Sequence, residues 1–155
     1  MAPNTAALAT AIAALSVSGV TMKNITNMPR SVTKADCPIF FPDPSEWFLD
    51  MHTDDDLAFV GQAGQYDVMR KLKYVYIHAP SIAANPISTY YAAMAAKVDL
   101  LYNAIGAMNN GVAVVTKIGT SAFGELEAPT IGAGTIRNVF FGCFFEISFT
   151  ELVNP

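Results

Sequence analysis

Charged side chains are scarce in this sequence. Lysine, arginine, aspartate and glutamate make up 14% of the 155 residues, whereas apolar residues make up 52%. Globular domains usually have about a quarter of their residues charged. So few charges on so much apolar side chain indicate that another subunit covers part of the surface. The net charge of −4 at pH 7 also leaves no basic footprint, which argues against sequence-specific binding of nucleic acid.

Cysteine is nearly absent. The sequence has only Cys37 and Cys143, which are too few for a disulfide framework. Both lie in apolar, strand-like runs, where a free cysteine behaves as a small hydrophobic residue. We expect two reduced thiols in the core, as is usual in proteins made in the cytosol.

No lysine or arginine precedes the first apolar run, which lies within residues 1–19 (MAPNTAALATAIAALSVSG). A signal peptide needs such a positive region, so none is expected. The run is also too short, and too rich in threonine and serine, to span a bilayer.

The sequence has no catalytic signature. Asp50, His52 and Asp54 share one face of an extended backbone, an arrangement that suits a metal ion as well as a solvated acidic turn. No second segment of ligands is evident, so we expect the acidic turn, with no metal and no cofactor. His78 ends a predicted strand and has no nucleophile motif near it, which favours a hydrogen-bonding role over catalysis. The glycine-rich 132–135 segment lacks the lysine of a phosphate loop and is expected to be a loop tip.

Two helices are predicted from apolar periodicity. A short one begins at Asn4 or Thr5, which can cap it, and runs to about Ser16. A long one spans about residues 86–108, since Asn85-Pro86 is a typical helix start. Its spacing of apolar residues predicts that it packs on a sheet through Ile87, Met94, Val98, Leu101 and Ile105.

Strands are predicted from alternation and composition. They cover residues 39–41, 71–79 and 112–119, with a hairpin near residues 61–64 in an otherwise irregular 43–70 stretch. Strand pairs with few helices favour an α+β fold: a mainly antiparallel sheet with both helices packed on one face. We expect one domain, residues 1–155, with an extended arm or long loop at about 119–136.

The last strand, VFFGCFFEISFTEL at residues 139–152, is unusually aromatic. Its odd positions are all apolar and are expected to face the core. Its even positions are aromatic at one end and polar at the other, so Phe140 and Phe144 need a cover. Fully extended, the 16 residues 137–152 would span roughly 53 Å, whereas a domain of this size is only about 40 Å across.

Two explanations account for this excess length. Either the strand bends at Gly142, or its N-terminal half leaves the domain as half of a hairpin. We favour the second explanation, in which a neighbouring subunit covers the exposed aromatic side chains. The predicted interface residues are Phe123, Arg137, Phe140 and Phe144.

The order of these segments resembles that of the tail-terminator and neck proteins of tailed bacteriophages. The shared outline is a first short helix, the proline-broken CPIFFPDP strand, the KLKYVYIH strand, one long helix and a final aromatic strand ending in FEISFTEL. The resemblance implies a hexameric ring that caps the tail tube, stops its polymerisation and presents a surface to the head. It also implies assembly in the host cytoplasm, location in the virion neck, and DNA passing through the ring.

Other functions fit the same residues. A head-closure or adaptor protein and a tail-tube-like subunit belong to the same structural class. A small ligand-binding domain or an enzyme belongs to a different class, and the aromatic residues are the feature that would form its pocket. Scarce charge and the lack of a catalytic motif favour the structural class.

Overall fold

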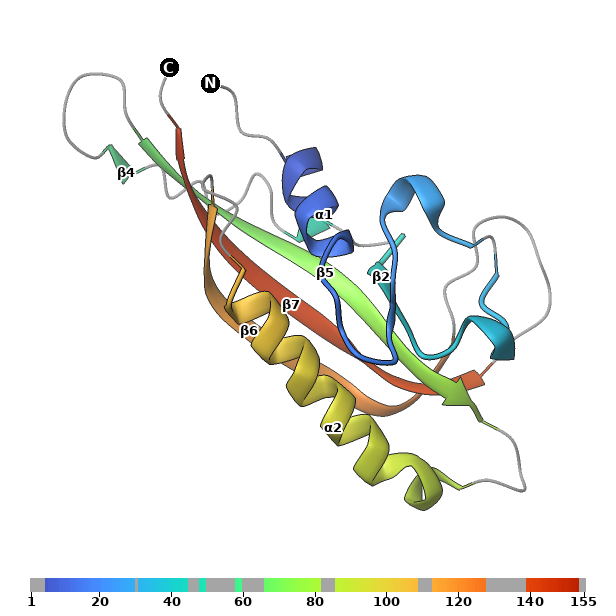
Figure 1. The fold of residues 1–155 in the computed structure, drawn as a ribbon. Helices are drawn as coiled ribbons and strands as arrows, with labels where there is room; N and C mark the ends of the chain where they lie inside the picture. The colour runs from blue at the N-terminus through green and yellow to red at the C-terminus, as the bar shows by residue number, and fades with distance from the viewer. Residues whose placement is uncertain are drawn as a thin grey trace.

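The computed structural model has a mixed α+β fold with one long and one short helix, as the sequence predicts (Figure 1). The structure describes residues 5–29, 31–44, 48–49, 58–59, 66–81, 86–108, 113–127 and 139–153. Within them the elements are α1 (Thr5–Ala13), β1 (Thr21–Met22), the 3₁₀ helices η1 (Ile25–Asn27) and η2 (Lys34–Asp36), β2 (Ile39–Pro42), β3 (Phe48–Leu49), β4 (Ala58–Phe59), β5 (Tyr66–Pro80), α2 (Ile87–Gly106), β6 (Ala113–Glu127) and β7 (Val139–Val153).

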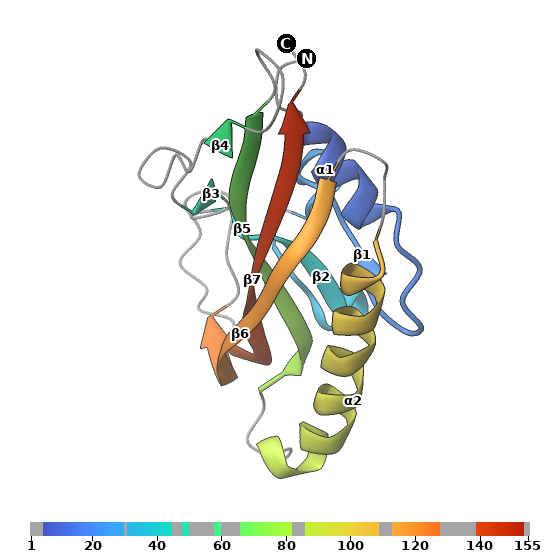
Figure 2. The same cartoon turned by 90° about the vertical axis from the view of Figure 1, so that its left-hand side faces the viewer.

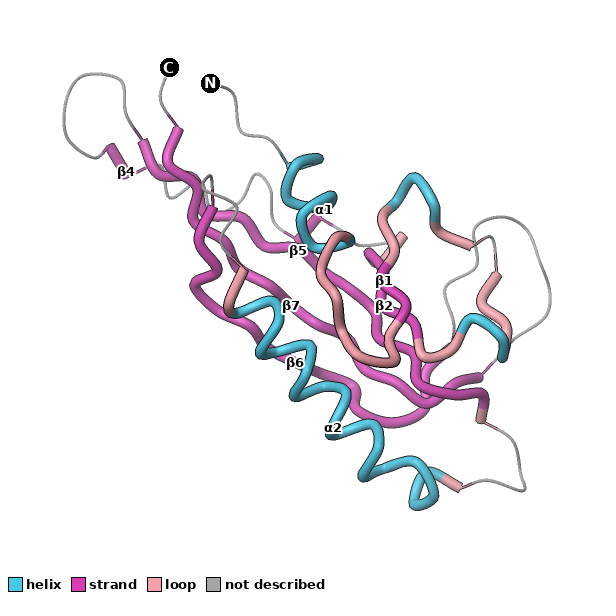
Figure 3. The backbone as a smooth tube through the Cα atoms, in the orientation of Figure 1, coloured by secondary structure: helices cyan, strands magenta, loops and turns pink. Residues whose placement is uncertain are grey.

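The strands form one sheet in the order β1-β2-β5-β7-β6, and β3 and β4 also pair with β5. Every pairing among the described strands is antiparallel except that of β1 with β2. β5, β6 and β7 have 15 residues each and run side by side as long, curved strands (Figure 3). The prediction of a mainly antiparallel sheet is therefore confirmed.

β5 is longer than its sequence pattern indicates. The alternation predicts a strand over residues 71–79, whereas β5 begins at Tyr66 and ends at Pro80. The earlier start reflects pairing, because β7 lies along the whole length of β5. The predicted hairpin is also present, since Phe59 of β4 pairs with Tyr66 of β5.

The prediction of an arm or loop at residues 119–136 is wrong for its first half. β6 continues to Glu127 and pairs with β7 as far as Val139. Small residues such as Gly119 and Ala122 have weak strand preferences of their own, but pairing with an aromatic neighbouring strand overrides that preference. The remainder of the predicted arm lies outside the described residues.

α2 confirms most of the predicted helix phase. Met94, Val98, Leu101 and Ile105 are buried, and the helix bounds agree within two residues with the predicted ones. Ile87 is the exception, because its side chain is 37% exposed. Figure 2 shows the start of α2 extending past the end of the sheet, which agrees with this exposure.

Two clusters of buried side chains form the core. The first joins both helices to alternate residues of β5 and β7, and its members are Leu8, Ile12, Val17, Phe40, Leu72, Tyr74, Tyr76, Val98, Leu101, Ile105, Cys143, Phe145, Ile147 and Phe149. The second joins other residues of the sheet to the segment before β2, and its members are Val32, Ile39, Phe41, Val75, Ile77, Leu126 and Phe140. The odd positions of β7 are thus core residues as predicted, apart from Val139, which is 36% exposed at the start of the strand.

β7 stays in the sheet over its described length. Both neighbouring strands carry an irregularity opposite Gly142: β5 gains His78 as an extra residue, and β6 shifts register between Ser121 and Gly124. A β-bulge bends its strand and increases the local twist. The preferred explanation, in which the N-terminal half of β7 leaves the domain, is wrong because Phe140 pairs on both sides. The bulges opposite Gly142 agree with the other explanation, a bend of the strand at this residue.

Candidate subunit interface

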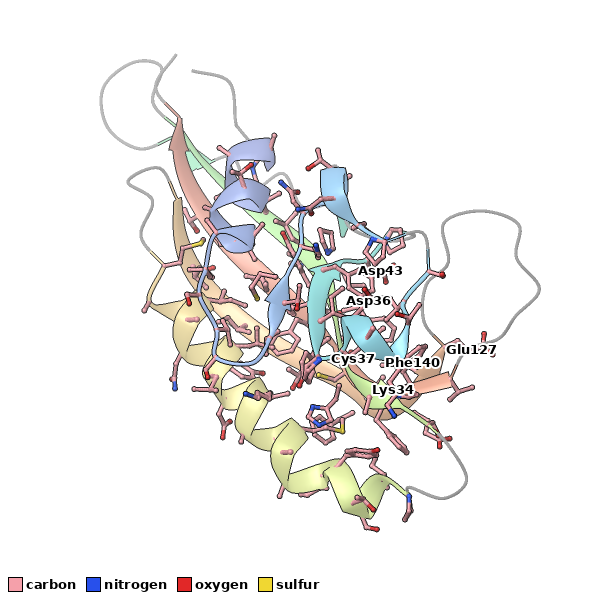
Figure 4. The ribbon with its side chains drawn as sticks, turned by 45° about the vertical axis from the view of Figure 1, so that its right-hand side comes forward. Lys34, Asp36, Cys37, Asp43, Glu127 and Phe140 are labelled. Atoms are coloured by element: carbon pink, nitrogen blue, oxygen red, sulfur yellow. The ribbon has the colours of Figure 1, made fainter. Side chains whose placement is uncertain are left out.

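Phe140 is not available to another subunit. Its side chain is 3% exposed and belongs to the second core cluster. Cys37 packs against that cluster from the segment before β2, and Figure 4 shows Phe140 beside this segment. The sequence prediction for Phe140 is wrong because the chain supplies the missing cover itself, through residues that carry no strand or helix periodicity.

Phe144 is only partly covered. It packs at the margin of the second cluster, and the ammonium group of Lys73 lies 4.5 Å from the centre of its ring. A cation over an aromatic face is attracted to it. Lys73 is also 3.6 Å from the buried carboxylate of Asp43. This ion pair fixes the ammonium group above the ring, so one side of Phe144 is occupied within the chain.

Phe123 is exposed, and it has an aromatic neighbour. Its side chain is 38% exposed, and its ring packs edge-to-face against Tyr91 of α2, with the ring centres 5.7 Å apart. Ala122, just before it, has a φ angle of 52°, a left-handed conformation that is uncommon outside glycine. This residue lies in the β6 irregularity, which places Phe123 at the outer edge of the sheet.

Tyr91 is the interface candidate that the sequence analysis missed. It is not among the residues predicted to pack on the sheet, and it is 59% exposed, the largest value among the exposed apolar residues described. The adjacent Tyr90 instead packs against His78 and Phe141. A distinction between neighbouring tyrosines depends on where the sheet ends, which periodicity does not record.

Several predicted site residues lie outside the described part of the chain. They are Arg137, Asp50, His52, Asp54 and the 132–135 segment. The expectation of an acidic turn without a metal therefore stays a prediction. Among the residues that the structure does describe, no group of three or more histidine, cysteine, aspartate or glutamate side chains is placed to hold a metal ion.

His78 is a half-buried hydrogen-bonding residue. Its Nδ1 lies 2.7 Å from the hydroxyl of Tyr76, and its ring contacts the ring of Tyr90. Burial lowers the pKa of His78, and the positive charge of Lys97 lowers it further. The strand-end position and the hydrogen-bonding role agree with the sequence analysis, although His78 is the bulged residue of β5 rather than a regular member of the alternation.

Both cysteines are free thiols. Cys143 is fully buried, and desolvation raises its pKa to about 12. Cys37 is partly buried, and burial, together with the charge of Asp36, raises its pKa to about 11. The two thiols are unbridged as expected, but only Cys143 is a core residue, because Cys37 is partly buried at the margin of the second cluster. Both thiols are held in the unreactive protonated form near neutral pH.

We expect neither cysteine to react readily in the native protein. At pH 8 an aromatic disulfide reagent should modify both thiols at least about tenfold more slowly than in urea, because only a small fraction is thiolate and Cys143 has no solvent access. The release of the coloured thiolate measures the rate. Rapid modification of Cys143 in the folded protein would contradict its burial.

Among the described helices, none combines the length and the apolar character needed to cross a lipid bilayer. Comparison with known proteins gives no match, whether with family models, curated proteins or solved structures.

Proposed function

We propose that this protein is a structural subunit of a phage virion: a tail terminator that forms a hexameric ring, caps the tail tube and offers a joining surface to the head. Its partners would be further copies of itself, the tail-tube protein and a head-completion protein. Its location would be the neck of the virion, after assembly in the host cytoplasm, and DNA would pass through the ring. We propose no enzymatic activity and no cofactor.

The observation that supports this proposal best is the exposed Tyr91–Phe123 pair at β6, the last strand of the sheet. Aromatic side chains are enriched in protein interfaces, whereas charged side chains are depleted at their centres. Low overall charge fits the same use. Among the predicted interface residues we therefore retain Phe123, with Tyr91 added, together with Phe144 and Arg137.

The fold also supports the proposal in outline. One core cluster holds buried residues of both helices, which fits the proposed arrangement of the two helices on one face of the sheet. An elongated sheet whose last strand remains open on one side among the described residues gives a subunit a long lateral surface. Ring subunits contact their neighbours through such surfaces, and the ring closes when the rotation between neighbouring subunits is a whole-number fraction of a full turn.

Electron microscopy of the purified protein tests the ring directly. We expect negatively stained particles to be rings with a central opening, and we expect purified tail tubes to carry one such ring at one end after mixing. Particles without an opening, under conditions where the protein is folded, would contradict the proposal.

Phe123→Asp is expected to raise the subunit concentration needed for ring formation about tenfold or more. A carboxylate placed at a desolvated contact would lack a partner there. Ile25→Asp is the matched control, because Ile25 is an apolar residue of similar exposure, 44%. It lies in η1, which follows β1, the strand at the opposite edge of the sheet from β6. Light scattering across a dilution series measures the effect. Equal assembly of Phe123→Asp and the wild type, with both folded, would remove this pair from the interface.

A further inference from the structure

An aromatic cluster connects the bulge of β5 to the N-terminal half of α2. It begins at Tyr76, which is fully buried and whose hydroxyl lies 2.7 Å from Nδ1 of His78. The His78 ring packs against the Tyr90 ring with centres 5.7 Å apart, and Tyr90 packs against Phe141 at 5.6 Å. Among the described residues, the buried positions of α2 begin at Met94, and before that residue the helix contacts the sheet through the rings of Tyr90 and Tyr91.

When Tyr76 donates the hydrogen bond within the cluster, His78 must be neutral at Nδ1. Burial raises the pKa of Tyr76 above its usual range, so the phenol keeps a proton that it can donate to Nδ1. Nδ1 of His78 can accept only when it carries no proton itself. Protonation of His78 turns Nδ1 into a donor, which leaves the buried Tyr76 hydrogen without this acceptor.

The surroundings of His78 also oppose a positive charge. Among the described residues, the groups that face it are Tyr76 from β5 and Tyr90 with Lys97 from α2. Lys97 is held in place by donating a hydrogen bond to the carbonyl oxygen of Ser18. A protonated His78 would therefore be repelled by the ammonium group of Lys97. Lys97 lies on α2, the same helix that the His78 ring contacts through Tyr90.

We propose that the Tyr76–His78–Tyr90 cluster is a pH-sensitive latch, which holds the N-terminal half of α2 on the sheet when His78 is neutral and releases it when His78 is protonated. The direction follows from linkage. A base whose pKa is lower in the closed state binds more protons in the open state, so acid favours opening. The stability of the latch is complete above the ordinary histidine pKa of about 6.5 and is lost as the pH falls below it.

Release has a consequence at the edge of the sheet. Tyr91 follows Tyr90 directly and holds its ring against Phe123 of β6. Opening of this part of α2 would separate that exposed pair as well. Protonation of His78 would thus change the shape of the surface beside β6. This effect does not depend on which partner binds that surface.

Histidine titration and hydrogen exchange together test the latch. The sequence has two histidines, so a His52→Gln variant leaves His78 as the only imidazole in the nuclear magnetic resonance spectrum and gives its titration directly. In the same variant we expect the amides of the N-terminal half of α2 to open about tenfold more often at pH 5 than at pH 7, after correction for intrinsic exchange. Opening should begin to increase near the ordinary histidine pKa of about 6.5 and should level off at the lower pH where His78 itself titrates in the closed state.

Two further variants separate the latch from general acid sensitivity. The double variant with His52→Gln and His78→Gln should show no pH dependence of opening, because the glutamine side chain does not titrate. If that variant does not fold, Tyr76→Phe serves instead, since it keeps the imidazole and should raise opening at pH 7 toward the value at pH 5. Opening that does not change between pH 7 and pH 5, or that changes equally without an imidazole at position 78, would overturn the proposal.

Discussion

Gly142→Ala is expected to destabilise the protein by about 3 kcal/mol or more, out of the ~5–15 kcal/mol that a domain of this kind has. A Cβ atom at this position would overlap the backbone carbonyl oxygen of Tyr76, and it would also lie 3.1 Å from that carbonyl carbon and 3.2 Å from Cα of Ile77. Side chains can rotate away from an added methyl group, but a backbone in the middle of a sheet cannot. Gly142 is thus required where β5 and β7 come close together.

Gly124→Ala is the matched control for this substitution. Gly124 pairs directly with Gly142 across the ladder, yet a Cβ atom on it would meet nothing within 4 Å. We expect its stability to stay within about 0.5 kcal/mol of the wild type. Urea unfolding monitored by circular dichroism compares the two. Equal stability of the two variants would contradict the close strand approach at Gly142.

Phe145→Ser is expected to unfold the protein or to cost about 4 kcal/mol or more. The Phe145 side chain is fully buried, with the ring of Phe40 5.3 Å away and that of Tyr102 5.5 Å away. Phenylalanine truncation in a core costs about 3–5 kcal/mol, and serine adds a hydroxyl that needs a partner. Thermal unfolding measures the loss.

The neighbouring Phe144→Ser variant should remain folded. Phe144 is only partly buried and is covered on one side by Lys73, so its truncation removes fewer contacts. We expect it to weaken the proposed oligomer instead. If Phe144→Ser unfolds the protein as severely as Phe145→Ser does, then both faces of β7 are core at this point and Phe144 does not belong to an interface.

Strict periodicity in the sequence predicts well which side chains of a strand or helix are buried. The alternation along β7 identified Phe145, Ile147 and Phe149 as core residues, and the helical spacing identified Leu101 and Ile105, since burial and side-chain direction follow from local geometry. The extent of β6 could not be predicted in this way. Its strand conformation depends on pairing with β7, and the register of that pairing leaves no signal in the β6 residues themselves.

The side chains that cover Phe140 show a second limit of prediction from the sequence. Val32 and Cys37 belong to a segment of short 3₁₀ helices and turns without apolar periodicity, so the sequence shows no layer there. Phe123 lies within the predicted arm or loop at 119–136, but its exposure comes from an irregularity in an edge strand. The exposure of Tyr91 has no signal in the sequence, because helical spacing does not show where the edge of the sheet lies.

The mass of the native particle tests the central proposal most directly. Light scattering coupled to size exclusion, over a range of protein concentrations, separates a ring from a single chain without reference to any partner. We predict a closed species of six copies of the 16.6 kDa chain, about 100 kDa, that does not grow further as the concentration rises. A species of 16.6 kDa at every concentration, from protein that is folded, would contradict the account of this chain as a ring-forming subunit.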